Sequence, residues 1–419
     1  MDQLAVGIIG AGVGGLCLAQ GLKQAGVKVD VFERDATQMS PVEGYRLSLS
    51  ASGGRALKSC LPPRAFERLA TTSGEPSRGV TFLDHRMNRL LGLDFPHSDR
   101  LSDESERPIG RSALRSVLLD GLDDLVHFGK KFVAYEREAN GRATAFFADG
   151  SKAAADLLVG ADGANSAVRM QLLPDAKRVE TGIVAVGGKM PLSEPLRALM
   201  PDALLRGPTP ILGPRGCFMF VSAMLYGDLP DHQARVASLD REEYMMWGFS
   251  ARRSRFEDGC VAEDLNGREL KRRVEALTAD WHPTLRGLAR GTDPATVKSF
   301  AVKTSTPVAP WRTTNVTLLG DALHNMPPFR GVGANTALWD AQLLSETIAE
   351  VARGRRPLLD ALADYEGRVI EHGFRAVRTS LAAMAQFHDE KQFSRTLTKA
   401  FMRAVDRVPP LKAAMSAER

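Results

Sequence analysis

The stretch VTLLGDALHNMPPFRGVGANTALWDAQLL, residues 316–344, decides the fold of this chain. Its apolar start predicts a buried strand, and Gly320 and Asp321 then make a tight turn. A loop broken by prolines follows, and a helix is predicted after it because apolar residues recur at helical spacing (338, 341, 344 and 348). We therefore expect Asp321 at the carboxyl end of a strand, where open α/β sheets bind their ligands.

Two glycines, at 331 and 333, precede that helix. They would let main-chain N–H groups come close to a flat or charged group, and the helix would present its positive N-terminal end to the same group. A strand, a turn and a helix with a capping Asp also occur as ordinary scaffold. The rest of the chain decides between a ligand site and a scaffold.

A second strand–turn–helix unit lies near the N-terminus. A short apolar segment, residues 4–9, leads into GAGVGG, which fits G-x-G-x-x-G, and a helix and a second strand ending on Glu33 follow. Gly10 permits a tight turn, Gly12 lets a pyrophosphate approach the backbone, and Gly15 allows the helix to pack on the strand. Glu33 can accept hydrogen bonds from ribose hydroxyls. The unit predicts dinucleotide binding and does not choose between NAD and FAD.

A third strand end carries an Asp-Gly turn at Asp162 and Gly163. Three short strands are predicted as a small meander whose last member runs into this turn (131–136, 143–147 and 157–159). The segment from Ser166 follows directly, so we expect Arg169 within reach of the turn.

Three arginines lie close to these motifs in the sequence. Arg34, directly after Glu33, fits a place along an adenine and equally a solvated surface position. Arg46, in a loop that enters a strand (residues 41–49), would either approach a phosphate or a cofactor ring or be an arginine at a strand edge. Arg111 stands at the start of a predicted helix, where a phosphate could be held.

The character of the sequence changes between residues 181 and 301. Segments of this region predict the strands of a larger antiparallel sheet and two helices (182–190, 217–225 and 244–250; 270–277 and 285–288). The strands are rich in Phe, Met and Trp, and alternation sends about half of these residues to one face. Most should form core, and a minority is expected to line a substrate cavity, with Phe218, Phe220 and Met224 as candidates.

Size and charge limit the function classes. With 419 residues, 44% of them hydrophobic, the chain can bury a large core, and its length suggests two or three packed regions. The net charge is +5, and residues 391–419 carry seven basic and two acidic residues, so the remainder is close to neutral. A basic nucleic-acid-binding body is therefore not expected.

The cysteines and the start of the chain favour the cytoplasm. The four cysteines form no C-x-x-C, which favours a reducing compartment and argues against a structural zinc site and a dithiol enzyme (17, 60, 217 and 260). We find no signal-peptide pattern and no apolar run long enough to span a bilayer. No metal site is expected.

The last predicted helix, residues 393–405, is amphipathic. Basic residues recur at every fourth position, and Phe393, Leu397, Phe401 and Val405 recur on the opposite side. We expect this helix to lie on the body of the protein with its basic side in solvent. Contact with a membrane surface or an acidic partner is the less favoured alternative.

Taken in order, the three strand-end motifs resemble those of the group A FAD-dependent aromatic monooxygenases, the para-hydroxybenzoate hydroxylase type. The run GDALHNMPPFRGVGAN, residues 320–335, looks much like the tetracycline-inactivating and natural-product hydroxylases of that superfamily. The resemblance covers about residues 4–375. In the middle sheet it is limited to the general type of structure, and no motif matches there.

The resemblance implies an α/β fold with two domains. The first is a Rossmann-like FAD-binding domain, with a parallel sheet and a small β-meander, made of discontinuous segments (1–75, 100–178 and 299–375). The second is a substrate-binding domain of antiparallel sheet covered by helices (76–99 and 179–298). A helical C-terminal segment would follow (376–419).

The resemblance also implies cofactor contacts. The ADP half of FAD would be bound by the glycine motif and the residues at the end of the second strand (Gly10, Gly12, Val13, Gly14, Gly15, Glu33 and Arg34). Arg111 would hold the ribityl–pyrophosphate region, Asp162 would touch both FAD and the incoming NAD(P)H, and Asp321 would bond a ribityl hydroxyl. Arg46 would either approach a phosphate or the flavin ring or be an arginine at a strand edge.

The loop before the long helix has two implied roles. Its main chain would face the pyrimidine end of the isoalloxazine and stabilise negative charge on the reduced ring (Gly331, Val332, Gly333, Ala334 and Asn335). Pro328 and Phe329 would flank the ring near the substrate. The family often has Gln where this chain has Val332, and some relatives have an acidic residue where it has Ser48, which leaves the nicotinamide contacts open.

The implied reaction is a monooxygenation. NADPH or NADH would reduce non-covalently bound FAD, O2 would add to give a flavin C4a-hydroperoxide, and one oxygen would go to an aromatic or polycyclic small molecule. The product would be hydroxylated or epoxidised, as in natural-product or xenobiotic metabolism. No residue stands out as a catalytic acid or base, and His324 is expected to be a structural part of its loop.

Two sequence motifs that the chain lacks narrow the class of flavoprotein. The chain has no second G-x-G-x-x-G, which disfavours two-Rossmann enzymes and favours transient docking of the nicotinamide, and no W-x-W-x-I-P run, which disfavours a flavin halogenase. The alternatives are an FAD-dependent oxidase or dehydrogenase without oxygen insertion and a non-catalytic escort protein on the same scaffold. The intact glycines, Glu33 and Asp321 argue against the escort protein. The protein would be a monomer or a homodimer.

Overall fold

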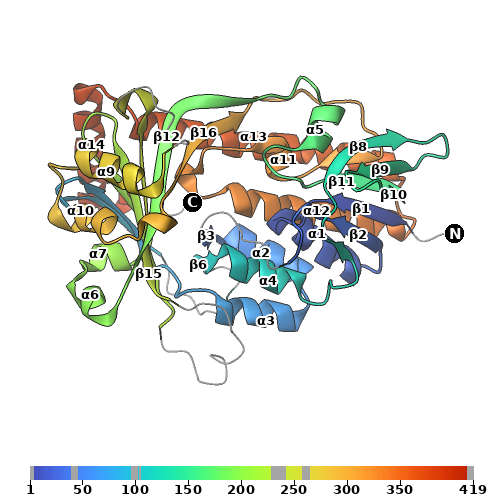
Figure 1. Cartoon of the computed structure of the whole chain (residues 1–419), viewed down its shortest axis with the longest axis horizontal. Helices are drawn as coiled ribbons and strands as arrows, with labels where there is room; N and C mark the ends of the chain where they lie inside the picture. Colours follow the sequence, from blue (N-terminus) through green and yellow to red (C-terminus); the bar gives the residue numbers. More distant parts are fainter. Residues whose placement is uncertain are drawn as a thin grey trace. The chain divides into compact units, whose positions relative to one another are not determined.

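The computed structural model describes residues 4–38, 46–95, 102, 105–227, 242–256 and 265–412. Residues 41–45, Cys260 and the end of the basic tail, 413–419, lie outside the described residues. Contacts divide the chain into two compact units, each described here by itself (Figure 1). Unit 1 consists of Met1–Ser73, Leu101–Val179 and Lys303–Leu381, and unit 2 of Gly74–Arg100, Glu180–Val302 and Ala382–Arg419.

Unit 1 is built around a parallel sheet. Its strand order is β17-β11-β1-β2-β7 (Val316–Leu318, Leu157–Gly160, Ala5–Ile9, Lys28–Phe32 and Val126–His127). Strands β11 and β17 are buried along their whole length. A parallel sheet is covered on both faces, which explains why these strands appear in the sequence as continuous apolar runs.

The small meander of unit 1 differs from the sequence prediction. It has the order β10-β9-β8 (Lys152–Ala155, Ala143–Phe147 and Phe132–Arg137), whereas the segment 157–159 belongs to β11 of the parallel sheet. The prediction was wrong at this point because the sequence of β10, KAAA, consists of residue types that are depleted in strands. The apolar LLVG predicts a third strand for the meander equally well, but it is β11 of the parallel sheet.

Two helices of unit 1 run side by side in the same direction. Along α1 (Val13–Gln24) and α12 (Gly333–Ala352), Gly14 lies against Ala337, and Gly21 lies against Ser345. From the first contact to the second, the chain moves about two turns toward the C-terminus in both helices, so the helices are parallel. The small residues let the two backbones come close.

The remaining elements of unit 1 surround this pair. The helices are α2, α3, α4, α5, α11 and α13, and η5 is a 3-10 turn (Ala51–Cys60, Pro63–Thr72, Arg111–Leu119, Ala167–Leu172, Asp321–His324 and Leu358–Phe387; Pro328–Arg330). Helix α13 continues beyond Leu381 into unit 2. A two-stranded ribbon pairs β3, Arg46–Leu49, with β6, Arg107–Gly110.

Unit 2 contains a seven-stranded sheet in the order β16-β12-β15-β14-β13-β4-β5 (Lys298–Ser305, Arg178–Pro191, Tyr244–Arg252, Phe218–Met224, Thr209–Leu212, Gly79–Asp84 and Arg89–Asp94). Strands β12, β15, β14 and β13 pair antiparallel, as predicted, and β13 pairs parallel with β4. The helical elements are α6, α7, α9, α10, α14, η1 and η4 (Glu194–Leu199, Asp202–Leu205, Gly267–Leu277, Pro283–Arg290, Gln392–Arg407, Arg253–Arg255 and Pro294–Thr296).

The core of unit 2 lies on one face of this sheet. Met219, Val221 and Ala223 of β14 point into it, together with alternate residues of β15 and with apolar residues of α9 and α10. The alternation predicted from the sequence therefore places Phe218 and Phe220 on the opposite face.

Helix α14 is oriented differently from the prediction. Phe393, Leu397 and Phe401 are exposed, whereas Arg395, Met402 and Val405 are buried against unit 2. The expected arrangement, with the basic side in solvent and the apolar side inward, holds for Val405 and is wrong for Phe393, Leu397, Phe401 and Arg395. The buried side is mixed, because Met402 and Val405 pack there beside Arg395, and Asp406 of this helix also pairs with Arg89 of β5. Among the described residues, no helix has both the length and the apolar character needed to cross a bilayer.

Candidate cofactor site

The three predicted strand ends meet at one edge of the parallel sheet. Strands β1, β11 and β17 are neighbours, so their carboxyl ends lie next to each other. The main chain links the turns as well, since Ala161 N donates to Ile9 O (2.8 Å) and Leu319 N to Gly160 O (3.1 Å). Segments that are far apart in the sequence are thus brought together at one edge of the sheet.

The glycines of the motif have different structural roles. Gly10 has a φ of +106°, and a Cβ there would clash with the carbonyl of Ala161 in the neighbouring turn. A Cβ at Gly15 would overlap the carbonyl oxygen of Gly10. At Gly12, by contrast, an added Cβ would meet no atom of the described residues within 4 Å. Gly10 and Gly15 are required by the fold, and the space beside Gly12 is open to a ligand.

Two uncapped helix N-termini face the same edge. Helix α1 begins after Gly12 and helix α12 after Val332, and neither takes a side-chain cap from the described part of the chain. Because the helices are parallel, their positive ends lie side by side, each equivalent to roughly half a unit charge. The first-turn N–H groups have no partner within their helices. This arrangement favours an anionic group (Val13, Gly14 and Gly15; Gly333, Ala334 and Asn335).

Glu33 is held beside the glycine motif. Its Oε2 accepts from Ala11 N (2.6 Å) and its Oε1 from Asp35 N (3.0 Å), and the residue is buried. Each carboxylate oxygen can accept a further hydrogen bond, as a ribose diol requires. Arg34, the next residue, is exposed, which leaves both of its readings open.

Arg115 is a residue that the sequence prediction missed. It is buried on α4, and its Nη1 lies 3.3 Å from Asp35 Oδ2. Its Nε and Nη2 have no partner among the described residues. The signal was present, because Arg115 follows Arg111 by one helical turn and therefore shares its face of α4.

Both carboxylate oxygens of Asp162 accept hydrogen bonds from its own turn and the helix that follows. Its Oδ1 accepts from Ser166 Oγ, and its Oδ2 accepts from Ala167 N (2.7 Å) and Val168 N (3.2 Å) at the start of α5. Burial raises the pKa of Asp162 above its ordinary value, although these hydrogen bonds oppose the rise. What this turn offers a ligand is main chain, at Gly163, where an added Cβ would meet no described atom within 4 Å.

Arg169 connects two of the turns. Its Nη1 donates to Ala164 O and to Ala322 O, both at 3.1 Å. The first carbonyl belongs to the Asp162 turn and the second to α11, which begins at Asp321. The prediction that Arg169 reaches the Asp162 turn is confirmed, and its second contact, with α11, was not foreseen.

A buried pair supports the turn that carries Asp321. Asp340 Oδ2, on α12, accepts from Gly320 N (2.8 Å) and from His324 Nε2 (2.7 Å), and both side chains are fully buried. Burial lowers the pKa of His324, but the attraction of Asp340 outweighs this effect and the pKa is raised overall. His324 is thus structural, as predicted, and Asp321 itself is exposed at the first position of α11.

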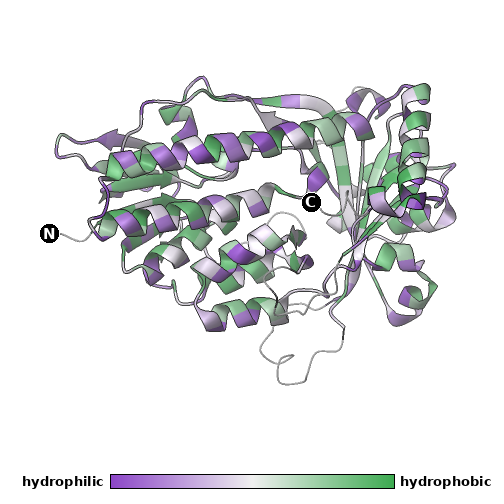
Figure 2. Ribbon diagram, turned by 180° about the vertical axis from the view of Figure 1, so that it is seen from behind, coloured by the Kyte–Doolittle hydropathy of each residue, from purple (hydrophilic) through white to green (hydrophobic). Residues whose placement is uncertain are grey.

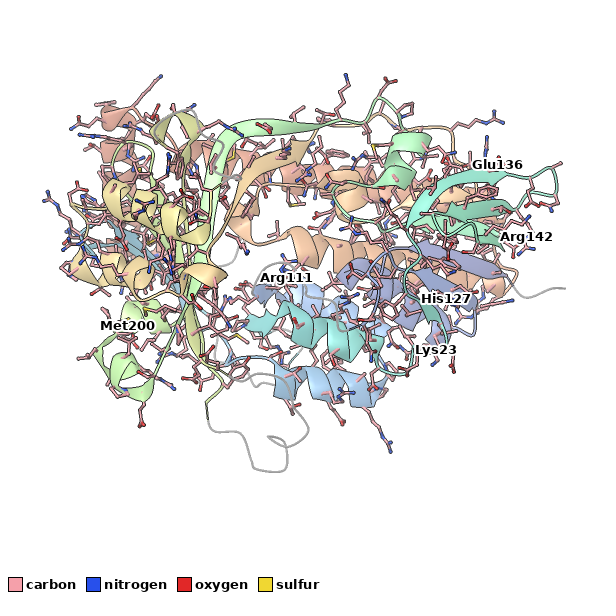
Figure 3. All side chains as sticks on the ribbon, viewed as in Figure 1. Lys23, Arg111, His127, Glu136, Arg142 and Met200 are labelled. Carbon is pink, nitrogen blue, oxygen red and sulfur yellow. The ribbon has the colours of Figure 1, made fainter. Side chains whose placement is uncertain are left out.

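The β3–β6 ribbon brings two arginines to the start of α12. Arg46 lies opposite Gly110, so it neighbours Arg111, which Figure 3 labels at the start of α4. Asn335 of α12 holds the ribbon, since its Nδ2 donates to Ser48 O (2.9 Å) and its Oδ1 accepts from Ser50 N (2.9 Å). Arg46 is buried, with its Nη2 3.2 Å from the hydroxyl of Ser48.

The substrate candidates fall into different environments. Pro328 is exposed and Phe329 half-buried in η5, directly before the α12 N-terminus. In unit 2, Phe220 is half-buried and Met224 fully buried. Phe218 is also buried, with its ring stacked on Phe387 at 4.5 Å between centroids. The structure does not support Phe218 and Met224 as substrate contacts, because packing within unit 2 covers them.

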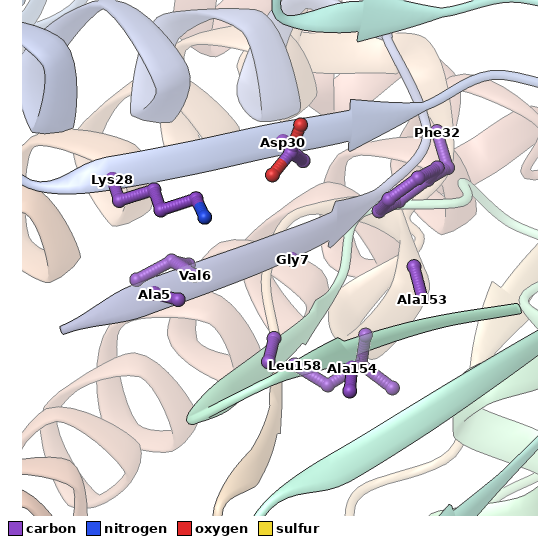
Figure 4. A pocket seen from close by; sticks show the side chains of 10 residues that line it. Ala5, Val6, Gly7, Lys28, Asp30, Phe32, Ala153, Ala154 and Leu158 are labelled. Carbon is purple, nitrogen blue, oxygen red and sulfur yellow. The ribbon is translucent and has the colours of Figure 1, made fainter. Parts of the chain in front are cut away.

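One small cavity of about 50 Å³ lies elsewhere in unit 1 (Figure 4). It is lined by residues of β1, β2 and β10, including Lys28 and Asp30, and not by the strand-end turns. Ligand pockets for molecules of cofactor size measure roughly 300–1,000 Å³. This cavity is therefore no candidate for the cofactor site.

Family comparisons decide which cofactor fits this edge. The model of the "FAD binding domain" matches residues 121–380, and the model of the "NAD(P)-binding Rossmann-like domain" matches residues 8–38. The chain belongs to the FAD-dependent monooxygenase family. The FAD-domain match includes the Asp162 and Asp321 turns, and the Rossmann-like match includes the glycine motif and Glu33. The resemblance seen in the sequence is confirmed.

Individual relatives agree with this assignment. A solved structure from Photorhabdus luminescens, assigned as an FAD-containing monooxygenase, is 33% identical, with a TM-score of 0.81, covering 91% of this chain and 98% of that one. The FAD-dependent urate hydroxylase of Klebsiella pneumoniae is 29% identical, covering 86% of this chain and 84% of the relative. A dual O-methyltransferase/FAD-dependent monooxygenase of Cercospora beticola is 31% identical, covering 87% and 44%. The chain thus spans about half the length of the first curated relatives it matches.

Proposed function

We propose that this chain is an FAD-dependent monooxygenase that uses NADPH or NADH and O2 to hydroxylate or epoxidise a small aromatic or polycyclic molecule. The observation that carries the proposal is the convergence of three strand-end turns with two uncapped, parallel helix N-termini. The family to which the chain belongs supports the oxygen chemistry, and the urate hydroxylase among its relatives supports an aromatic substrate.

The residues at the edge of the sheet fit FAD. The N-terminus of α1 and the open space beside Gly12 suit the pyrophosphate, and Glu33 suits the ribose of the ADP half. Arg111 would support the ribityl–pyrophosphate region, and Arg46 would approach a phosphate or the ring. Asp321, exposed at the head of α11, would accept a hydrogen bond from a ribityl hydroxyl.

The start of α12 would act on the ring. The main chain from Gly331 to Asn335 would face its pyrimidine end, where helix N–H groups stabilise negative charge. Asn335 would keep this main chain in place through its side-chain bonds to the β3–β6 ribbon. The Asp162 turn would offer main chain to both FAD and the nicotinamide co-substrate.

Bound FAD would supply the electron transfer from NAD(P)H and the activation of O2. The chain's own residues would position the cofactor and substrate and keep water out, since none of the described site residues stands out as an acid or base. Pro328 and Phe329 would flank the ring near the substrate, and Phe220 stays a candidate substrate contact. Unit 1 would be the FAD-binding domain and unit 2 the substrate-binding domain. We further propose a cytoplasmic location and a monomer or homodimer.

The test uses purified yellow protein with NADPH or NADH and a panel of phenolic, polycyclic and indole-like compounds. We expect at least one compound to accelerate NAD(P)H oxidation and to gain one oxygen atom, which carries the label when the reaction runs under ¹⁸O₂. Compounds that are oxidised without gaining labelled oxygen would favour the oxidase or dehydrogenase reading, which the relatives do not favour. A flavin that NAD(P)H does not reduce would contradict the proposal.

A further inference from the structure

Helix α14 packs within unit 2 through a mixed side, on which Met402 and Val405 are buried beside polar groups. Asp406 receives two bonds from the Arg89 guanidinium (Nε 3.1 Å, Nη2 2.9 Å) and a third from Gly92 N (3.0 Å). Arg403 Nη2 lies 3.5 Å from Asp84 Oδ2. Arg395 is buried, and its Nη1 donates to Asp389 O (2.7 Å). These bonds lie on the same side of the helix as the buried Met402 and Val405.

The opposite side of α14 is apolar and exposed. Phe393, Leu397 and Phe401 follow one another at four-residue intervals, so they share one face, and they are 83%, 61% and 60% exposed. Val408 and Leu411, beyond the helix, are also exposed. Figure 2, coloured by hydropathy, shows hydrophobic residues along α14. We call Phe393, Leu397 and Phe401 the apolar stripe.

Basic side chains lie at both ends of α14, and the acidic Glu390, just before the helix, is paired with Arg252 and Arg255. Lys391 and Arg407 are exposed at the two ends of the helix, and the Arg403 side chain is 43% exposed beside the stripe. The only acidic residue in the sequence of α14, Asp406, is turned inward and paired with Arg89. An anionic surface could therefore approach the apolar stripe without meeting a carboxylate of this helix.

We propose that the apolar stripe binds the surface of an anionic lipid bilayer. Large apolar side chains together with Lys and Arg on one helix are the pattern of helices that lie in a membrane interface. A second copy of the chain fits less well. A 16-residue helix is roughly 24 Å long and about 10 Å wide, so its face covers roughly 250 Å². A stable dimer buries about 800 Å² on each partner.

The test measures co-sedimentation of the full-length protein with vesicles. One set is phosphatidylcholine alone, and the other contains about one third phosphatidylglycerol. We expect binding to the anionic vesicles that is at least about tenfold stronger than to the neutral ones and that weakens as salt rises. The variant Arg407→Glu should weaken the binding to anionic vesicles and leave the weak binding to neutral ones unchanged.

The decisive variant is the triple substitution Phe393→Ser, Leu397→Ser and Phe401→Ser. All three side chains are exposed, so the fold should be retained, and vesicle binding should fall by roughly 100-fold. The matched control replaces three exposed apolar residues outside this surface by Ser, Val133, Met170 and Leu199, and should bind as the unchanged protein does. FAD content should be equal in the unchanged protein and in the variant of the apolar stripe, because the stripe lies in unit 2 and the cofactor residues in unit 1.

Several outcomes would overturn the proposal. One is a lack of binding to anionic vesicles by the unchanged protein. Another is an equal loss of binding in the control triple variant. A third comes from sedimentation velocity, where a dimer that becomes a monomer in the Phe393, Leu397 and Phe401 variant, without any vesicle binding, would assign the apolar stripe to a second copy of the chain.

Discussion

His324 and Asp340 form a fully buried pair, with His324 Nε2 2.7 Å from Asp340 Oδ2. The same oxygen accepts from the main-chain N–H of Gly320, one residue before Asp321. A single carboxylate on helix α12 therefore holds the turn from which we propose that Asp321 meets the cofactor.

We expect Asp340→Ala to destabilise the protein by about 3–5 kcal/mol, because it leaves the buried His324 without its partner. Urea denaturation of the variant and of the unchanged protein gives this difference in the free energy of unfolding. The control is Glu346→Ala, an exposed position on the same helix, which should change the stability by less than about 0.5 kcal/mol. Equal effects of the two substitutions would show that the pair does not support the fold.

The proposed flavin site predicts a different result for substitution of Asp321. Because this side chain is exposed, Asp321→Ala should leave the free energy of unfolding of the apoprotein nearly unchanged, and FAD affinity should fall about tenfold through one lost hydrogen bond. Fluorescence titration of the apoprotein with FAD measures the affinity. Asp360→Ala, in the exposed first turn of α13, is the control and should bind FAD normally. Undiminished affinity of the Asp321 variant would remove this residue from the site.

Two glycines of one motif should respond in opposite ways. Gly12→Ala places a Cβ in open space at an ordinary φ of −75°, so it should cost less than about 1 kcal/mol of stability, while FAD affinity should fall at least about tenfold. Gly15→Ala should instead destabilise the fold by roughly 1–3 kcal/mol, because its Cβ would overlap the carbonyl oxygen of Gly10. Thermal unfolding of the apoproteins and FAD titration separate the two effects. If Gly12→Ala bound FAD as tightly as the unchanged protein, the pyrophosphate would not approach at Gly12.

Unit 2 carries a buried histidine that should make the protein sensitive to acid. His388 Nδ1 donates to Met384 O (2.8 Å), and its Nε2 lies 2.9 Å from Ser250 Oγ. Burial lowers the pKa of His388 to about 4, so the folded state holds it neutral. The associated stability is complete above an unfolded-state pKa of about 6.5 and is lost as the pH falls toward 4. The loss should reach roughly 3 kcal/mol.

The measurement compares free energies of unfolding between pH 7 and pH 4. His388→Gln should show a slope with pH that is smaller by that amount, because Gln does not titrate. Ser250→Ala removes one hydrogen bond and keeps the imidazole, so it should lower stability at every pH and retain the slope. The assignment fails if the Gln variant loses stability toward acid as steeply as the unchanged protein.

Much of unit 1 could be predicted from local sequence. The strand ending at Leu318, the positive φ of Gly320 and the helix from Gly333 all appear in the structure. Each depends on the spacing of apolar residues or on a glycine that the turn requires, and both signals lie within a few residues. The segment 157–159 shows where this reasoning ends. Its residues suit a strand of either sheet, and only its pairing with β1 and β17 assigns it to the parallel one.

In the candidate site, too, some residues could be found from local sequence and others depend on tertiary contacts. The motif residues at 10–15, 33, 162 and 321 could be found from the sequence, and Asn335 was predicted for its main chain only. Arg115, Asp340 and the side chain of Asn335 owe their roles to distant partners. Asn335 bonds to Ser48 and Ser50, which lie more than 280 residues away in the chain. No local pattern specifies such a partner, because it depends on how the ribbon and the helix pack.

By itself, the sequence determined the strand ends, the glycine turns and the amphipathic helices of this protein, since these follow from short-range periodicity and backbone freedom. Only the tertiary structure decided which turns are neighbours, which carboxylate holds Gly320, and which side of α14 faces outward. An amphipathic pattern shows that a helix has two sides, but the side that packs depends on the surface it meets. In α14, the inward side combines the buried Met402 and Val405 with the Asp406 that pairs with Arg89, and Phe393, Leu397 and Phe401 lie in solvent.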